Sequence, residues 1–244
     1  MGYTLSILKR ELASYFITPV AYVFIVIFLF LTGIFTFYLG SFFERGMADL
    51  QPFFVFHPWL YLFLIPAISM RLWSEERKQG TIELLMTLPI PMYAMVLGKF
   101  LAAWAFTAIA LALTFPLWIT VNYLGSPDNG VILAGYIGSF LMAGAYLAIG
   151  SFISSISKNQ VISFVASVVV CLLFILAGFP GVLEFVSGFA PQWLINTISQ
   201  FSFLTNFESL TKGIIDGRFV VYVFSMIGCF LFANAVMVEM KKAD

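Results

Sequence analysis

Charge is scarce in this sequence of 244 residues. Only 10% of the residues are charged and 61% are hydrophobic, whereas about 25% of the residues in an average soluble domain are charged. This composition excludes a sizeable soluble domain and indicates one integral membrane domain over residues 1–244. Twelve basic residues balance twelve acidic ones, so the net charge gives no reason to expect a nucleic-acid partner.

Motifs that bind nucleotides or catalyse reactions are also missing. The sequence has no G-x-x-x-x-G-K-[ST] loop, no G-x-G-x-x-G pattern and no G-x-S-x-G elbow. One histidine, His57, and two cysteines, Cys171 and Cys229, form no cluster with metal-ligand spacing. We therefore predict no catalytic residue, metal or cofactor in this chain. His57 is expected to anchor the outer membrane boundary, with a proton relay as the less favoured alternative.

Six apolar stretches are long enough to cross a membrane as helices, which needs about 20 residues each. They run over about 19–40, 52–70, 93–123, 131–154, 161–183 and 219–238. The expected fold is therefore all-α, with six spans and both termini on one side. If that side is the cytoplasm, nine Lys and Arg residues lie inside and three outside, which agrees with the positive-inside rule.

The predicted spans contain no charge at mid-depth. Arg71 and Lys99 fall at cytoplasmic ends, from which long basic side chains are expected to extend to the membrane surface. A transporter driven by protons or sodium ions normally has an ionisable residue within the membrane, so this class is disfavoured. An intramembrane enzyme is disfavoured too, because the spans carry no polar catalytic cluster.

The first segment outside the spans, residues 1–18, repeats apolar residues at helical spacing. Lys9, Arg10 and Glu11 interrupt the apolar positions. This pattern predicts an amphipathic helix that lies in the cytoplasmic interface before the first span.

A second such segment, residues 184–218, is too apolar for a solvated loop and too broken by glycine and proline to span. We expect short external helices that dip into the outer leaflet or cap the bundle. Trp193, Phe207 and Glu208 are candidates for contact with a periplasmic auxiliary protein or for closing the pathway. Anchoring of the aromatic side chains in lipid is an equally favoured alternative.

Small residues recur every four positions in the fourth predicted span, at Gly135, Ser139 and Ala143. Such a stripe lets another helix approach closely. Packing within the chain is favoured over a subunit interface.

Charge is concentrated in one place, the run AISMRLWSEERKQGTIELLMTLPIP at residues 67–91, between the second and third predicted spans. Its four charged residues at 75–78 are expected to form solvated helical turns, which Gly80 and Thr81 interrupt. Prolines at the end of the run are expected to stop the helix. A charged amphipathic helix over 74–89 suits docking into a groove on a partner, and lying on the membrane surface is an equally favoured alternative.

The segment MRLWSEERKQGTIELLMTLPI resembles the signature of ABC-2 type permeases, in which an E-E-[RK]-x-x-G-T-[IL]-E-x-L-x-x-x-P run follows the second of six spans. A later segment, NFESLTKGIIDGRFVVY, is similar to the permeases associated with gliding motility and to the permease of the copper-reductase maturation system. That subgroup often has a histidine before the Phe-Glu pair, where this chain has Asn206. With the length and the six spans, the resemblance covers nearly the whole chain.

The resemblance implies a half-transporter. Such permeases pair as dimers, with an identical subunit or a paralogue, and two copies of a separate ATPase subunit bind ATP and Mg. The residues that the resemblance assigns to coupling with the ATPase, none of them catalytic, are Glu75, Glu76, Arg77, Lys78, Gly80, Thr81 and Glu83.

The function implied is a permease of the bacterial inner membrane, with both termini in the cytoplasm and lipid around the spans. It would couple ATP hydrolysis by its partner to export, or to mechanical work on an external protein. The alternative is a membrane scaffold that recruits cytoplasmic factors without transport. An ATPase whose turnover rises when this chain is reconstituted with it would distinguish the two.

Overall fold

The computed structural model of the protein describes residues 2–82, 90–188, 190–214 and 216–240. Every regular element within these ranges is a helix. The helices are α1 (Gly2–Ile17), α2 (Pro19–Ile34) with the π-helical turn η1 (Phe35–Leu39), α3 (Gln51–Val55), α4 (His57–Ser69), α5 (Arg71–Gln79), α7 (Met92–Ala112), α8 (Phe115–Leu124), α9 (Asn129–Ile156), α10 (Gln160–Leu176), α11 (Pro180–Ser187), α12 (Gln192–Gln200), α13 (Phe203–Thr211) and α14 (Gly217–Met240).

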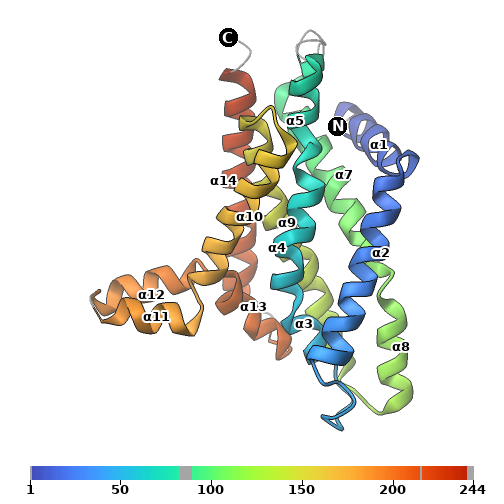
Figure 1. The fold of residues 1–244 in the computed structure, drawn as a ribbon, viewed down its shortest axis with the longest axis vertical. Helices are drawn as coiled ribbons and strands as arrows, with labels where there is room; N and C mark the ends of the chain where they lie inside the picture. Colours follow the sequence, from blue (N-terminus) through green and yellow to red (C-terminus); the bar gives the residue numbers. More distant parts are fainter. Residues whose placement is uncertain (1, 83–89, 189, 215, 241–244) are drawn as a thin grey trace.

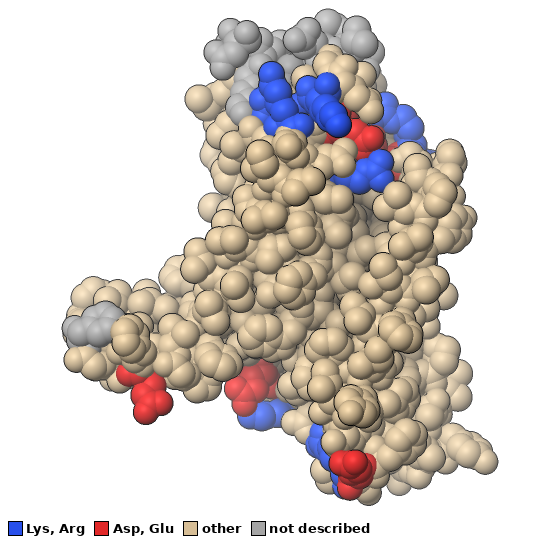
Figure 2. Space-filling view, viewed as in Figure 1, with Lys and Arg blue, Asp and Glu red and all other residues tan. Residues whose placement is uncertain are grey.

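The helices form an elongated bundle (Figure 1). Helices α1 and α5 and the last turns of α14 lie at one end, called the α5 end below, and α3, α8 and α13 lie towards the opposite α3 end. Helices α2, α4, α7, α9, α10 and α14 run between the two ends, while α11 and α12 project from the side. Figure 2 shows charged side chains at both ends and on this projection, and an uncharged band between them. An uncharged band is what contact with lipid requires.

Basic residues are unevenly divided between the two ends. The described ones on elements at the α5 end are Lys9, Arg10, Arg71, Arg77, Lys78, Lys99 and Lys158, and those on elements at the α3 end are Arg45, Lys212 and Arg218. The α5 end is therefore the more basic one.

Helix α9 is the centre of the bundle. Residues 142–151 are buried without interruption, and a helix that is apolar on all sides belongs in an interior. It packs against α4, α5, α7, α10, α13 and α14. Asn234 of α14 donates a hydrogen bond to Ser151 Oγ at 2.7 Å, so α14 is tied to α9 by a polar contact as well.

The small residues of α9 allow this close packing. Gly135, Ser139 and Ala143 are all buried within the chain. A Cβ atom at Gly135 would lie 2.5 Å from the Phe54 ring. At this point α9 packs against α3 of its own chain.

Within the described ranges, four segments are each long and apolar enough to cross a membrane. They are Pro19–Leu39, Met92–Leu124, Asn129–Ile156 and Gly217–Met240. Helices α10 and α11 meet the same criterion only as a pair bent by 69°. The chain thus has the helices of a multi-pass membrane protein. The described helices give four spans, or five with the bent pair, and the total of six remains a prediction.

Two predicted spans are not single helices. The stretch at 52–70 divides at Phe56 into α3 and α4, and Pro58 lies in the first turn of α4. The 13 residues of α4 extend only about 20 Å. In the stretch at 161–183, helix α10 ends at Leu176 and the chain bends before α11 begins at Pro180. The residue before a proline disfavours helical torsion angles, and Phe179 is extended, with φ −72° and ψ 125°.

His57 does not face the membrane surface, so the boundary-anchor prediction is wrong. Its side chain is fully buried, with its ring centroid 4.4 Å from that of Phe53 and 5.2 Å from that of Tyr61. Nδ1 lies 2.9 Å from the Phe53 carbonyl oxygen, which accepts a hydrogen bond from it. The first turn of α4 places the ring inside the bundle among these aromatic side chains.

Candidate functional site

The charged residues that follow the second predicted span lie on α5, which ends at Gly80. This glycine has a left-handed backbone, with φ 70° and ψ 6°, and its N–H donates to the Glu76 carbonyl. Left-handed glycine is a common helix terminator because it has no Cβ to clash. The amphipathic helix predicted over 74–89 is therefore interrupted at Gly80, and residues 83–89, with Glu83, lie outside the described residues.

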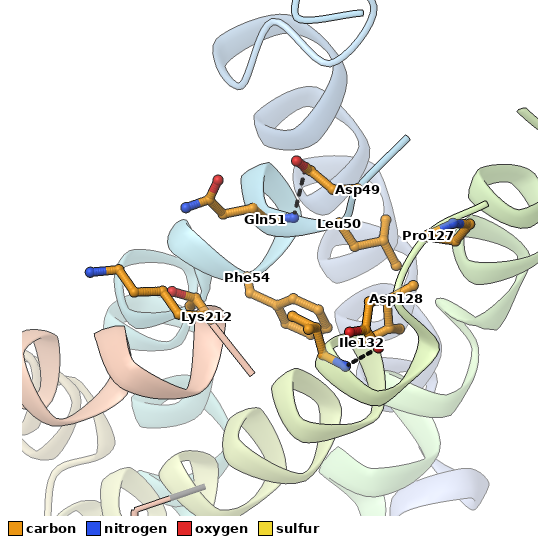
Figure 3. Close-up of a pocket in the computed structure, with 10 residues that line it drawn as sticks. Asp49, Leu50, Gln51, Phe54, Pro127, Asp128, Ile132 and Lys212 are labelled. Carbon is orange, nitrogen blue, oxygen red and sulfur yellow. Dashed lines mark hydrogen bonds between the residues drawn. The ribbon is translucent and has the colours of Figure 1, made fainter. Parts of the chain in front are cut away.

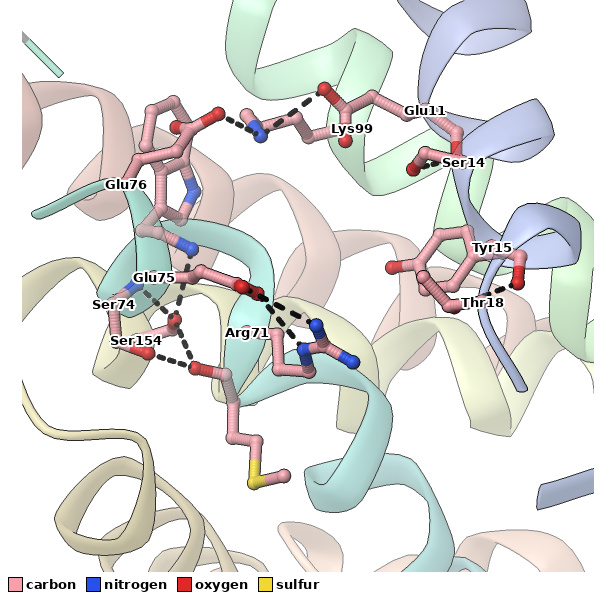
Figure 4. A network of polar contacts seen from close by, with 12 residues as sticks. Glu11, Ser14, Tyr15, Thr18, Arg71, Ser74, Glu75, Glu76, Lys99 and Ser154 are labelled. Atoms are coloured by element: carbon pink, nitrogen blue, oxygen red, sulfur yellow. Dashed lines mark hydrogen bonds and ion pairs between the residues drawn. The ribbon is translucent and has the colours of Figure 1, made fainter. Parts of the chain in front are cut away.

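Three helices meet at a buried ion pair beside α5 (Figure 4). Lys99 of α7 is 3% exposed, and its Nζ lies 2.7 Å from Glu76 Oε1 of α5 and 3.4 Å from Glu11 Oε1 of α1. The same Nζ lies 5.4 Å from the ring centroid of Trp73, within the range of a cation–π contact. We call Glu11, Trp73, Glu76 and Lys99 the Lys99 junction.

The two carboxylates of this junction titrate differently. Burial raises the pKa of Glu76, and the nearby Lys99 ammonium offsets this only in part. Burial also acts to raise the pKa of Glu11, but Lys99 and Arg10 together bring it below its usual value. Glu11 has two cations beside it, since Arg10 Nη2 lies 2.6 Å from its Oε1. Glu76 has only Lys99 as an ion-pair partner among the described residues.

Most of the predicted coupling residues on α5 are engaged within the chain. Glu75 accepts two hydrogen bonds from Arg71, at 2.9 and 3.3 Å. Arg77 Nη1 donates to the carbonyl oxygens of Ser155 and Ile156, at 2.8 and 2.6 Å, and so caps the last turn of α9. A cation at this position also opposes the negative end of the helix dipole.

Ser154 of α9 anchors the start of α5. Its Oγ accepts hydrogen bonds from the backbone N–H groups of Trp73 and Ser74, each at 3.1 Å, and donates to the Met70 carbonyl at 2.9 Å. These backbone groups lie at the junction of α4 and α5, where helical partners are incomplete. Helix α5 is thus fixed to α9 at both of its ends.

The exposed part of the predicted coupling set is small. Lys78 and Gly80 are exposed, whereas Glu75, Glu76 and Arg77 are half-buried. Thr81, also half-buried, donates from Oγ1 to the Glu76 carbonyl at 3.3 Å. The prediction of solvated turns over 75–78 holds for Lys78 alone.

Helix α1 packs along α7. Ile7 is buried, and a Cβ atom at Gly98 would lie 2.7 Å from Ile7 Cγ2. Lys9 and Arg10 are exposed, while Glu11 turns inward to Lys99. Of the three residues predicted on the interfacial helix, only Glu11 joins the α5 residues.

A cavity of about 480 Å³ lies between α1, α2, α4, α5 and α7 beside the junction. Its lining includes Glu11, Arg71, Glu75, Glu76 and Lys99 together with apolar side chains. The junction therefore forms part of a cavity wall.

A smaller hollow of about 250 Å³ lies at the α3 end (Figure 3). Asp49, Asp128 and Lys212 contribute to its lining. Asp128 Oδ1 caps the start of α9 by accepting from Gly130 N–H at 2.8 Å, and Asp49 Oδ1 accepts from Gln51 N–H at 3.2 Å. Both carboxylates therefore serve the local backbone.

The residues singled out in the segment 184–218 do not form one surface. Trp193 on α12 is 68% exposed, and Glu208 on α13 is exposed and paired with Lys212 at 2.7 Å. Phe207 is buried and its ring centroid lies 6.5 Å from that of Phe219. Phe207 is thus unable to contact a partner.

Lys99 is the main residue that the sequence reasoning missed. We expected its side chain to reach the membrane surface, and the structure buries it instead, because carboxylates from α1 and α5 satisfy its charge. A lysine directly after Gly98, in an otherwise apolar run, was the available signal. Among the described residues no group of three or more His, Cys, Asp and Glu side chains is arranged to hold a metal ion.

Comparison with known proteins agrees with the charged helix and the membrane-spanning segments. The family model described as "ABC-2 family transporter protein" matches residues 5–240. Heme exporter protein B of Rhodobacter capsulatus is 37% identical over 70 residues, which are 28% of this chain and 32% of that protein. The aligned part is thus about a third of that curated relative. The family match covers nearly all of the sequence, and the chain belongs to the ABC-2 family of transporter membrane proteins.

Proposed function

We propose that this chain is the permease subunit of an ABC transporter and that a separate ATPase docks at its α5 end. The observation that carries the proposal is the Lys99 junction, which ties the charged helix α5 to α1 and α7 through one buried ammonium group. A force applied to α5 would therefore reach both helices. The ATPase would bind ATP and Mg, and this chain would supply no catalytic residue.

The burial of the α5 side chains supports a division of roles. Lys78, together with the exposed turn at Gly80, is available to touch a partner. Glu76 and Arg77 already bind α7 and α9, so we assign them to transmission of movement rather than to docking. Thr81 and Glu83 follow the exposed turn, and we assign them to the docking side.

Transmission also requires that α5 and α9 move together. Arg77 and Ser154 fix α5 to α9, the most buried helix. Interiors are close-packed and shift between discrete arrangements rather than deform continuously. Movement of α5 would thus change the packing of α9 against its neighbours.

The remaining features follow the same proposal. The more basic α5 end would lie in the cytoplasm, with both termini there and the chain in a bacterial inner membrane. Two such subunits, identical or paralogous, would pair and bind two ATPase copies. They would drive export or mechanical work on an external protein. Trp193 and Glu208 are exposed and would be available to a periplasmic auxiliary protein.

The test is ATP hydrolysis by the complex. The tagged chain is purified with its bound ATPase from native membranes and reconstituted in liposomes. Lys78→Glu should reduce the ATPase recovered and its turnover, because it reverses an exposed charge at the docking site. Arg218→Glu is the matched control, since it reverses an exposed charge on α14 near the α3 end.

Two results would contradict the proposal. Equal ATPase recovery and turnover for wild type and Lys78→Glu would show that α5 is not the docking site. Absence of any stimulated ATPase with the wild-type chain would favour the non-transporting scaffold.

A further inference from the structure

The cavity beside the Lys99 junction has the size of a ligand site. Its volume of about 480 Å³ falls within the range of about 300–1,000 Å³ that is usual for small-molecule pockets. Five helices contribute to its wall, from α1 to α7. None of the contacts that define the proposed ATPase docking site requires this space.

One part of the cavity wall is charged. Glu11, Glu75 and Glu76 line it together with Arg71 and Lys99, so carboxylates outnumber cations. Glu76 Oε2 is buried and has no hydrogen-bond partner in the part of the chain that the structure describes. A buried carboxylate oxygen without a donor is costly, and a ligand that brings a donor would remove this cost.

The Tyr15 side chain lies in the same region. Its ring extends from α1 towards Arg71 and Glu75 in Figure 4, and it stacks on Phe106 with ring centroids 5.2 Å apart. Both rings line the cavity. The charged part of the wall is therefore bordered by aromatic surface.

The remainder of the wall is apolar and reaches the outside of the bundle. Val20, Val23 and Ile27 of α2 line the cavity and are also 51%, 55% and 43% exposed. Across from them, α4 contributes Leu64 and Ala67. The cavity thus opens along α2, which together with η1 is long and apolar enough to span a membrane.

We propose that this cavity binds a phospholipid with a zwitterionic amino-phosphate headgroup. Its phosphate would lie beside Arg71, its ammonium group would donate to Glu76 Oε2 and Glu75, and one acyl chain would lie between α2 and α4. An anionic headgroup without an amine fits less well, because the excess carboxylates would repel it. The site requires a membrane-embedded chain and no ATPase.

Native mass spectrometry of the purified chain tests the site. The chain is delipidated in detergent and offered phosphatidylethanolamine or phosphatidylglycerol with identical acyl chains. Wild type should retain one phosphatidylethanolamine and lose phosphatidylglycerol at lower collision energy. Ala67→Phe should abolish the retained lipid mass because the added ring occupies the space proposed for the acyl chain between α2 and α4. Ala13→Phe, the same change at an exposed position of α1 outside the cavity, should not.

A second variant separates headgroup recognition from general lipid binding. Arg71→Gln with Glu75→Gln neutralises an ion pair without leaving either charge alone, and it should remove the preference for phosphatidylethanolamine. Equal retention of both lipids by wild type, or full retention by a folded Ala67→Phe variant, would overturn the proposal. Because no ATPase is present, failure here leaves the docking proposal untouched.

Discussion

Replacing Lys99 by methionine should destabilise the chain and detach α1 and α5 from α7. Methionine keeps the length and the apolar stem of lysine but removes the ammonium group that pairs with Glu76 and Glu11. Both carboxylates then lose their shared cation, and Glu76 loses its only ion-pair partner among the described residues.

The size of the effect follows from burial. Removal of one partner from a buried ion pair typically costs about 3–5 kcal/mol. The Glu11 and Glu76 side chains keep 16% and 17% of their exposure, so some water reaches them and we expect about 2–3 kcal/mol. For a chain of this size, about 2–4 °C per kcal/mol gives a fall in melting temperature of about 4–12 °C.

Thermal unfolding in detergent, followed by tryptophan fluorescence, measures this fall. The double variant Lys99→Met with Glu76→Gln should recover most of it, because Glu11 still has Arg10. The coupling energy between Lys99 and Glu76 from the full cycle should be about 1–3 kcal/mol. An unchanged melting temperature for Lys99→Met, or a coupling energy of zero, would refute the junction as a stabilising contact.

Three further outcomes are expected from the same melting assay. Gly98→Val should lower the melting temperature by overpacking against Ile7, at a cost of about 1–3 kcal/mol, while Gly33→Val, where nothing lies within 4 Å of the added Cβ, should lose less; equal losses would contradict the close packing of α1. Gly80→Val should destabilise the left-handed end of α5 more than Gly80→Asn, and the reverse order would contradict that backbone. The folded chain holds the Glu76 proton more tightly than the unfolded chain, so the stability from Glu76 is fully present below about pH 4.5 and is lost as the pH rises through the raised pKa. The melting temperature of wild type relative to Glu76→Gln should therefore fall as the pH rises from about 4.5 through the raised pKa of Glu76. A rise would contradict a raised pKa of Glu76 in the folded chain.

The membrane-spanning helices could be predicted from the sequence, because the length and composition of each apolar run are local properties. The apolar runs of α9, of α14 and of α2 together with η1 reach the length of a membrane crossing, and length and composition are visible without tertiary contacts. The breaks near Phe56 and Phe179 also had a local signal, since each precedes a helix with a proline in its first turn.

The Lys99 junction had no comparable local signal. It joins residues from α1, α5 and α7, which are distant in sequence, and only the packing of α1 along α7 brings Glu11 to Lys99. The apolar neighbours of Lys99 in the sequence indicate an apolar environment. They do not identify the carboxylates that pair with the Lys99 ammonium group. The burial of His57 was missed for the same reason, because the aromatic rings around it come from other turns and helices.

A site-specific cross-link can show whether an ATPase docks on the exposed end of α5. In a chain with Cys171 and Cys229 replaced by alanine, Lys78→Cys is treated with a short bifunctional thiol reagent in native membranes, and Arg218→Cys serves as the control. We expect a cross-link from position 78 to a protein that hydrolyses ATP, and none from position 218. A cross-link to that ATPase from position 218 and not from 78 would contradict it.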